Sequence, residues 1–214
     1  FWRNADREIN YRRFFGLNDL ICVRQEDPAT FKQTHGLVFG LVDEGIFSGL
    51  RIDHVDGLAD PAAYLNRLHG RIGDRPIWVE KILSRDEHLP ADWPVAGTTG
   101  YEFAARLNDL FVRPDRADEL TAAYHDFIGT PSTWEQAVPA GKRTVLTTQF
   151  NGELDNLAAA FKRLAVRTLP GRDLTTAGLR AALAELAVCF PVYRTYITAD
   201  ILSPADREHL DRAL

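Results

Sequence analysis

The chain has 214 residues, of which 45% are hydrophobic and 26% are charged, a composition typical of globular proteins and not of disordered ones. The net charge of −5 provides no basic surface, which argues against nucleic acid as a partner. Because no apolar run reaches the length of a membrane span and no signal peptide opens the sequence, we expect a cytoplasmic protein without a membrane partner.

Two features of the composition suggest a piece of a longer protein. The sequence contains no methionine, and it opens on "FWRNADREINYRRFF", which reads as the middle of a pattern. We therefore expect an internal fragment. The two cysteines, Cys22 and Cys189, are far apart in the sequence and form no CxxC pair, so we expect two buried, reduced thiols.

The first half of the chain alternates between helical and strand patterns. Apolar residues at helical spacing predict a helix over 30–45, and "FSGLRIDHV" (47–55) predicts a strand. A second helix is predicted over 60–74, with Asp60 as N-cap, Pro61 in the first turn and Gly73 near the end. The apolar segment "RPIWVEKIL" (75–83) predicts a second strand, so the order is typical of parallel α/β units.

The second half is predicted to be mostly helical. A long loop over 84–100 follows the second strand, and such a loop in an α/β protein is usually functional. Residues 129–143 look like a break between helices, and "FPVYRTYI" (190–197) is compatible with a short strand. Helical patterns cover 100–112, 115–128, 153–168 and 175–189.

Two carboxylates stand out at the predicted strands. Side chains alternate along a strand, so Arg51 and Asp53 share one face, and Asp53 lies at the carboxyl end, where barrel enzymes keep catalytic groups. Arg51 would hold Asp53 ionised, as a desolvated carboxylate nucleophile. Glu80 is predicted in the middle of its strand, next to Val79 and Trp78, and an apolar setting favours the protonated form, which suits a general acid.

Such a pair on neighbouring strands is what a retaining glycosidase requires. The spacing by itself favours a plainer alternative, in which Arg51 and Asp53 form an ordinary ion pair and Glu80 belongs to an unrelated polar network. Resemblance to known proteins changes this balance.

Five segments follow one another along the chain: "INYRRFF", "GLRIDHVDGLADP", "VEKIL", "LPADWPVAGTTGYEF" and "FPVYRTY". Together and in this order they resemble the maltooligosyltrehalose synthase family of the α-amylase superfamily. Amylases place Lys-His shortly after the nucleophile, whereas this sequence has Asp56 and Gly57 at those positions.

The resemblance implies an α/β fold that is part of a (β/α)8 TIM barrel of α-amylase type with a mostly helical insertion. Residues 1–95 would form the central part of the barrel, 96–190 the insertion, and 191–214 the return to the barrel. The third catalytic carboxylate of the superfamily would lie beyond Leu214.

The implied reaction is an intramolecular transglycosylation with retention. The reducing-end α-1,4 bond of a maltodextrin or glycogen-derived glucan becomes an α,α-1,1 bond, with Asp53 as nucleophile and Glu80 as acid/base. The product, a maltooligosyl trehalose, would pass to maltooligosyltrehalose trehalohydrolase. His54, Lys81, Trp93, Tyr101, Tyr193 and Arg194 are candidate sugar contacts, and no metal or cofactor is expected.

Each candidate contact has an alternative. Trp93 is equally compatible with core packing, His54 with a structural hydrogen bond, and Tyr193 with an ordinary strand aromatic. His54, Asp56 and Asp60 lack the spacing of a metal site. At the level of function, the alternatives are an α-glucan hydrolase or 4-α-glucanotransferase of the same superfamily, or a non-catalytic carbohydrate-binding piece.

Overall fold

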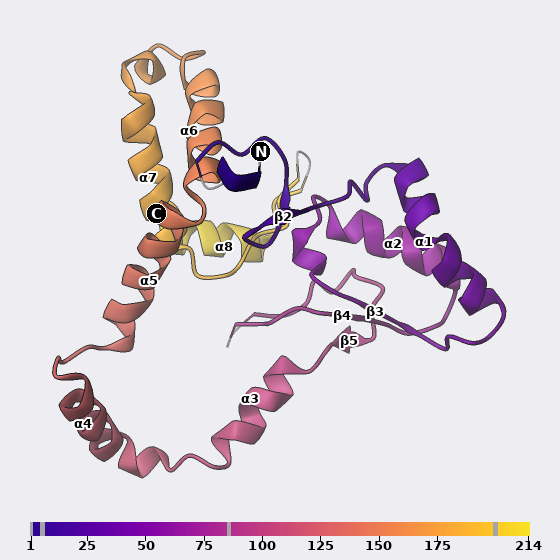
Figure 1. Cartoon of the computed structure of the whole chain (residues 1–214), viewed down its shortest axis with the longest axis horizontal. Coiled ribbons are helices and arrows are strands. Elements are labelled where there is room, and N and C mark those ends of the chain that lie inside the picture. Colours follow the sequence, from indigo (N-terminus) through magenta and orange to yellow (C-terminus); the bar gives the residue numbers. More distant parts are fainter. Residues whose placement is uncertain (1, 5–6, 85–86, 199–200) are drawn as a thin grey trace. The chain divides into compact units, whose positions relative to one another are not determined.

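The structure is a computed structural model that describes residues 2–4, 7–84, 87–198 and 201–214 (Figure 1). The chain divides into two compact units. One unit consists of residues 23–117, and the other of residues 1–22 together with 118–214. Each unit is described by itself.

Residues 23–117 form a small parallel α/β unit. Its strands β3 (Leu50–Ile52), β4 (Ile77–Val79) and β5 (Gly97–Thr98) are all parallel and lie in the order β3-β4-β5. Helix α1 (Pro28–Asp43) precedes β3, and helix α2 (Pro61–Ile72) connects β3 to β4. The predicted helix–strand–helix–strand order is confirmed, and β5 is an additional strand within the segment predicted to be a loop.

The boundaries of α2 follow from local chemistry. The carboxylate of Asp60 accepts a hydrogen bond from the backbone N–H of Ala63 at 2.8 Å, and Pro61 occupies the first turn, where no backbone N–H is needed. The helix ends at Gly73, whose φ of 68° lies in the region that favours glycine. These three predicted signals are confirmed.

The two faces of the sheet differ in exposure. Ile77 and Val79 are fully buried, and in Figure 1 the helices α1 and α2 lie together on one side of the strands. On the opposite face, Arg51 is exposed and Trp78 is 40% exposed. The buried helical partners of this unit include Phe31, Val42, Leu65, Leu68 and Ile72.

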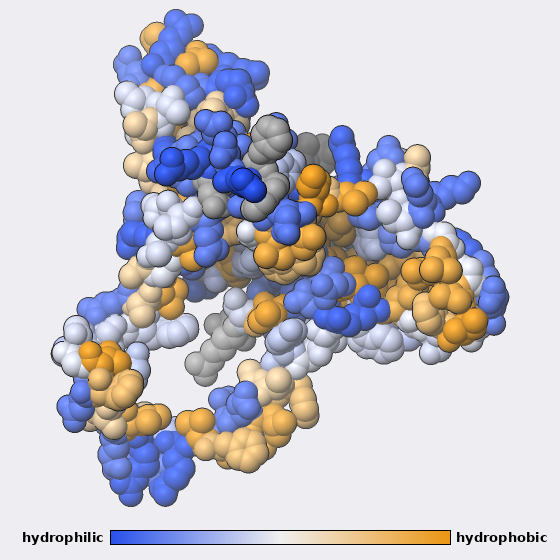
Figure 2. Space-filling view, viewed as in Figure 1, coloured by the Kyte–Doolittle hydropathy of each residue, from blue (hydrophilic) through white to orange (hydrophobic). Residues whose placement is uncertain are grey.

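The remainder of this unit is the helix α3 (Tyr101–Asp109), followed by the short 3₁₀ turn η3 (Pro114–Arg116). No residue of α3 is buried. Figure 2 shows hydrophobic residues on the surface of this helix, which include Phe103 and Leu107.

The other unit is mostly helical. It contains α4 (Ala117–Ile128), α5 (Trp134–Thr148), α6 (Asn151–Ala165), α7 (Thr176–Cys189) and α8 (Pro204–Ala213), with the 3₁₀ turns η1 (Trp2–Asn4) and η4 (Pro170–Asp173). Leu154 and Ala158 of α6 pack against Leu183 of α7 to form its core cluster. The ammonium of Lys142 in α5 donates to the carbonyls of Val188 and Phe190 at 3.1 and 2.7 Å, which stabilises the end of α7.

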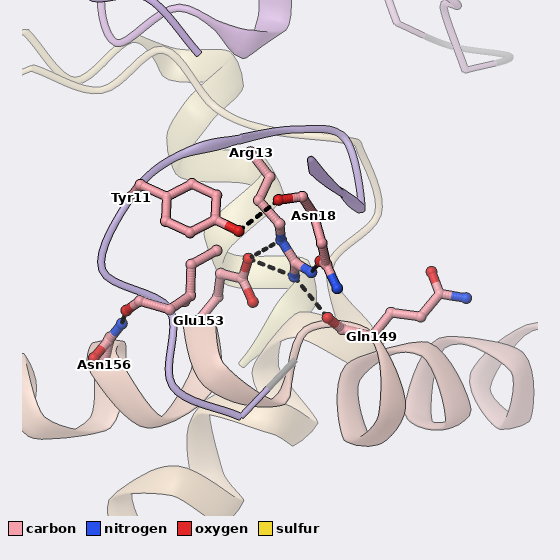
Figure 3. A network of polar contacts seen from close by, with 7 residues as sticks. Tyr11, Arg13, Asn18, Gln149, Glu153 and Asn156 are labelled. Atoms are coloured by element: carbon pink, nitrogen blue, oxygen red, sulfur yellow. Dashed lines mark hydrogen bonds and ion pairs between the residues drawn. The ribbon is translucent and has the colours of Figure 1, made fainter. Parts of the chain in front are cut away.

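An antiparallel hairpin joins this helical unit through a buried arginine. The strands β1 (Arg13–Phe14) and β2 (Leu17–Ile21) pair with each other, and Arg13 is only 5% exposed. Its guanidinium donates through Nε and Nη2 to Glu153 Oε1 of α6, at 2.9 and 2.6 Å, and also to the carbonyl of Gln149 at 2.7 Å (Figure 3). The fork geometry of arginine allows several acceptors to be bound at once.

Three expectations for this unit are wrong. The break predicted over 129–143 is confined to 129–133, because α5 begins at Trp134 with a capping box between Thr133 and Gln136 and continues past Pro139. Residues 190–197 contain no strand. Neither cysteine is buried, since Cys22 is half-buried and Cys189 is exposed.

The α/β class of the chain is confirmed, together with a largely helical second half. Within the residues that the structure describes, the parallel strands do not close into a barrel, so the TIM barrel and the division into 1–95, 96–190 and 191–214 stay predictions. In those same residues, none of the helices combines the length and the apolar character needed to cross a membrane.

Candidate active site

Asp53 and Glu80 follow directly after neighbouring parallel strands. Residues 50–52 of β3 pair in register with residues 77–79 of β4. The backbone N–H of Glu80 then donates to the carbonyl of Ile52 at 2.7 Å, which continues the ladder one residue further. The predicted adjacency of two parallel strand ends is confirmed. The sequence predicted Glu80 within its strand, but the structure places Glu80 just beyond the end of β4.

The carboxylate of Glu80 is held by the turn that begins at Asp53. Glu80 Oε2 accepts a hydrogen bond from the backbone N–H of His54 at 2.8 Å. His54 adopts a left-handed conformation, with φ 47° and ψ 49°, which a non-glycine residue rarely adopts. The strained residue aims its N–H at Glu80, so the two strand ends are joined by a hydrogen bond in addition to the ladder.

Arg51 and Asp53 form the predicted ion pair. Arg51 Nη2 lies 2.7 Å from Asp53 Oδ1, as expected for residues two apart on one face. Their side chains are 55% and 58% exposed, respectively. Asp53 is therefore not desolvated in this structure, which differs from the sequence-based expectation, and an exposed pair of this kind contributes little to stability.

Lys81 is buried. Its Nζ lies 3.2 Å from Asp56 Oδ2 and 2.6 Å from Glu87 Oε1, and its side chain has no exposed surface. These contacts favour a structural role over the predicted contact with sugar hydroxyls.

The other predicted sugar contacts differ in accessibility. Trp93 is only 6% exposed, which favours core packing, whereas Tyr101 is 46% exposed. His54 is half-buried and its ring lies against Gly57, where an added Cβ would come within 2.8 Å of the imidazole Nδ1.

An open cavity of about 590 Å³ lies on the exposed face of the sheet, which carries Arg51 and Trp78. It is lined by Arg51, Trp78, Thr98, Thr99 and Tyr101. Trp78 is the Cα partner of Arg51 across the two strands, so both side chains share this face. The hydroxyl of Thr99 is buried without a hydrogen-bond partner among the described residues. Trp78 and Thr99 were missed as site residues, although Trp78 precedes Glu80 by two and the alternation of side chains indicates its direction.

Tyr193 and Arg194 lie in the helical unit. Tyr193 is 65% exposed, and the Arg194 side chain donates to the carbonyl of Thr195 at 2.9 Å and lies 5.0 Å from the centre of the Tyr196 ring. The strands β3 and β4 belong to the other unit, so the expectation that these residues reach the sugar stays a prediction. Among the described residues, no group of three or more His, Cys, Asp or Glu side chains is placed to hold a metal ion.

Two carboxylates follow directly after neighbouring parallel strands, and the cavity lined by Arg51, Trp78 and Tyr101 lies on the same sheet. This arrangement is compatible with an α/β enzyme that acts on carbohydrate. Comparison with known proteins makes this specific. The chain is similar over 99% of its length to the solved structure of maltooligosyltrehalose synthase from Arthrobacter ramosus, with a TM-score of 0.82 and 41% identity. It is also similar over 95% of its length to the structure of the DSM5389 glycosyltrehalose synthase, with a TM-score of 0.78 and 35% identity.

The sequence comparison agrees with the structural one. A curated protein of Mycobacterium tuberculosis (strain H37Rv), named as a maltooligosyl trehalose synthase, is 43% identical over 122 residues, which is 56% of this chain. The resemblance to maltooligosyltrehalose synthases is therefore confirmed. The match covers only 16% of that protein and 26% of the Arthrobacter structure. No family model matches the chain.

Proposed function

We propose that this chain carries the nucleophile and the acid/base residue of a retaining transglycosylase that acts on α-1,4-glucans. Asp53 is the nucleophile, and Glu80 is the general acid and base. The observation that supports this assignment most directly is the hydrogen bond between Glu80 Oε2 and the backbone N–H of His54, the residue after Asp53. Adjacent strands lie about 4.8 Å apart, a spacing compatible with the roughly 5–5.5 Å between the two carboxyl groups of retaining enzymes.

The proposed reaction has two displacement steps. Glu80 protonates the glycosidic oxygen, the bond to the reducing-end glucose breaks, and a carboxylate oxygen of Asp53 bonds to the anomeric carbon of the remaining chain. Glu80, now ionised, then removes the proton from the anomeric hydroxyl of the retained glucose, whose oxygen displaces Asp53. The product is an α,α-1,1-linked maltooligosyl trehalose, with every atom of the substrate kept.

Retention of the glucose distinguishes this reaction from hydrolysis. Trp78 and Tyr101 line the cavity with aromatic side chains that are 40% and 46% exposed, as stacking on a sugar requires. Arg51 contributes a guanidinium at the same cavity and a direct contact with Asp53. The Asp53 side chain is exposed, so surfaces other than this face of the sheet must exclude water from the glycosyl-enzyme.

The substrate, the cellular compartment and the pathway partner belong to the same proposal. The substrate is a maltodextrin, the enzyme works in the cytoplasm, and its product is consumed by a hydrolase that releases trehalose. The names of the similar proteins support a role in trehalose synthesis.

The test is a product assay with the complete protein that carries this sequence. Incubation with maltopentaose should consume reducing ends without releasing glucose, which is measured as loss of reducing sugar at constant total carbohydrate. A rise in reducing sugar would identify a hydrolase, whereas formation of longer maltodextrins at constant reducing sugar would identify a 4-α-glucanotransferase. Binding of maltodextrin without any product would identify a carbohydrate-binding protein.

A further inference from the structure

Lys81 is a buried charge next to the proposed acid/base residue. Its ammonium lies between two carboxylates that are themselves nearly buried, with exposures of 9% for the Asp56 side chain and 7% for that of Glu87. Burying three charges is unfavourable unless their geometry is well matched, and an apolar trio of the same volume is often equally stable. The cluster is therefore poorly explained by stability alone.

The three charges connect segments that the proposed chemistry requires to be fixed. Asp56 lies in the 3₁₀ turn η2 (Val55–Gly57), which begins directly after His54. Glu87 belongs to the loop after β4, where its carboxylate also accepts from the backbone N–H of Ser84 at 3.0 Å. Lys81 thereby connects the turn after β3 to the loop after β4.

Glu80 and Lys81 contact the same turn at two different points. Glu80 reaches the backbone N–H of His54, and Lys81 reaches the carboxylate of Asp56, two residues further along the turn. Two consecutive residues thus attach the end of β4 to one turn at two points, which restricts rotation of the Glu80 carboxylate about the chain axis.

We propose that Lys81 is a positioning residue that, through Asp56 and Glu87, fixes the orientation of the Glu80 carboxylate. This inference rests on the proposed function of Glu80. It replaces the sequence-based expectation that Lys81 binds sugar, because an ammonium without exposed surface is not available to a sugar hydroxyl.

The test uses the complete protein and two substrates that differ in their need for an acid. A maltooligosaccharide requires protonation of its leaving group, whereas α-maltosyl fluoride does not. The main variant is Asp56→Asn/Lys81→Met/Glu87→Gln, which removes the three charges of the cluster together and keeps side chains of similar size. Asp56→Asn is the milder variant, because Lys81 keeps Glu87 as a counter-charge and the amide keeps the shape of the carboxyl group.

We expect kcat for maltopentaose to fall about 10–100-fold in the triple variant, with KM changed less than about twofold, because a small misplacement of a catalytic group has effects of this size. First-turnover release of fluoride should fall less than about threefold, because that step needs no acid. The ratio of the maltopentaose rate to the fluoride-release rate should therefore fall in the triple variant. In Asp56→Asn it should also fall, by a smaller factor. Asp43→Asn/Arg71→Met is the matched control, since this exposed ion pair of the same unit joins α1 to α2, and it should change neither rate.

Each other outcome overturns the inference in a recognisable way. An equal fall with both substrates, or no fall with either, means that the cluster has no role in orienting Glu80. A raised KM at unchanged kcat means that Lys81 contacts the sugar. If the triple variant does not fold, the ratio measured for Asp56→Asn decides, and an unchanged ratio there overturns the proposal. Failure of the proposed function is separate, because the wild-type protein would then not isomerise maltopentaose at all.

Discussion

Glu80 accepts a hydrogen bond from the backbone N–H of His54 at 2.8 Å, although the two residues are 26 positions apart. The contact links a carboxylate after one strand to the residue that follows a second carboxylate, Asp53, after the neighbouring strand. Its donor is the backbone N–H, so the hydrogen bond does not use the imidazole of His54. The orientation of the Glu80 carboxylate therefore depends on the backbone conformation of the turn that contains His54.

Substitution of the two carboxylates should separate their roles. Asp53→Asn should abolish turnover while maltodextrin binding persists, because the amide is nearly the same shape and forms no glycosyl ester. Glu80→Gln should severely slow reaction of a sugar leaving group, and with α-maltosyl fluoride it should accumulate the glycosyl-enzyme, because Glu80 is also the base that discharges it. Intact mass followed by peptide mapping locates the adduct.

An adduct on a peptide without Asp53 would reassign the nucleophile. Fluoride release by Glu80→Gln without any adduct would indicate direct displacement, and with it inversion at the anomeric carbon. Asp115→Asn is a control for both variants, because its carboxylate pairs with Arg113 on an exposed segment outside the proposed site.

Gly49 should not tolerate a side chain. A Cβ at this position would lie 2.9 Å from the carbonyl oxygen of Pro76 and 2.9 Å from the Trp78 ring, at the point where β3 begins to pair with β4. Gly49→Ala should lower the free energy of unfolding by about 1–3 kcal/mol, as overpacking commonly does. Thermal unfolding of the complete protein measures the change.

The matched control is Gly36→Ala in the exposed interior of α1, where nothing lies within 4 Å of an added Cβ. Because alanine favours a helix over glycine, this variant should raise stability by about 0.5–1 kcal/mol. Equal effects of the two substitutions would show that the close approach at Gly49 does not exist in solution.

His35 should make stability depend on pH. Burial lowers the pKa of His35 below its ordinary value of 6.5, and the hydrogen bond to the carbonyl of Phe31 opposes this only in part. A carbonyl can only accept, so Nδ1 of His35 carries the proton and Nε2 accepts the hydrogen bond from the Tyr64 hydroxyl at 2.8 Å. Burial raises the pKa of Tyr64 to about 12, so this hydroxyl stays protonated. The folded chain thus binds fewer protons at His35 than the unfolded chain.

The direction of the effect follows from linkage. The contribution of His35 is fully present above about pH 6.5 and is lost as the pH falls through 6.5 towards the lower pKa of the folded state. Denaturant midpoints measured from pH 7.5 to 5 should therefore fall less steeply in His35→Gln than in the wild type. Parallel curves for the two proteins would contradict the assigned tautomer and the lowered pKa.

Arg13 should be a strong determinant of stability in the helical unit. Arg13→Met removes several hydrogen bonds of a buried guanidinium to Glu153 and Gln149, and hydrogen bonds to charged groups contribute about 1.5–3 kcal/mol each. A clearly lowered thermal midpoint is expected. Arg143→Met, which breaks the exposed pair with Glu185, is the control and should have little effect. Similar midpoints for both variants would show that the Arg13 network in Figure 3 is not formed in solution.

The 214-residue chain produced alone should self-associate. Large apolar side chains are left in solvent, and Phe103, Leu110, Phe111 and Phe127 are 69%, 78%, 83% and 88% exposed. Exposed apolar surface of this kind drives association. Size-exclusion chromatography with light scattering should give oligomers, and Phe103→Ser/Leu110→Ser should reduce them. A monodisperse monomer would contradict the expectation.

The elements that could be predicted from the sequence have local causes. Asp60, Pro61 and Gly73 fix α2 because a cap, a proline in the first turn and a left-handed glycine act within a few residues. The alternation of side chains in an extended segment placed Arg51 and Asp53 on one face for the same reason. Helix α5 was predictable in principle from Thr133 and Gln136, but Pro139 obscured the signal.

The sequence by itself thus determined the order α1, β3, α2 and β4, and that Asp53 lies at the carboxyl end of a strand. Only the tertiary structure decided which side chains are buried, because burial depends on partners distant in the sequence. Lys81 is hidden because Asp56, 25 positions earlier, and Glu87 converge on it. Trp78 reaches the cavity and Trp93 the interior, although both are tryptophans in apolar segments. Burial is a property of the packed fold, and the local pattern of residue types does not encode it.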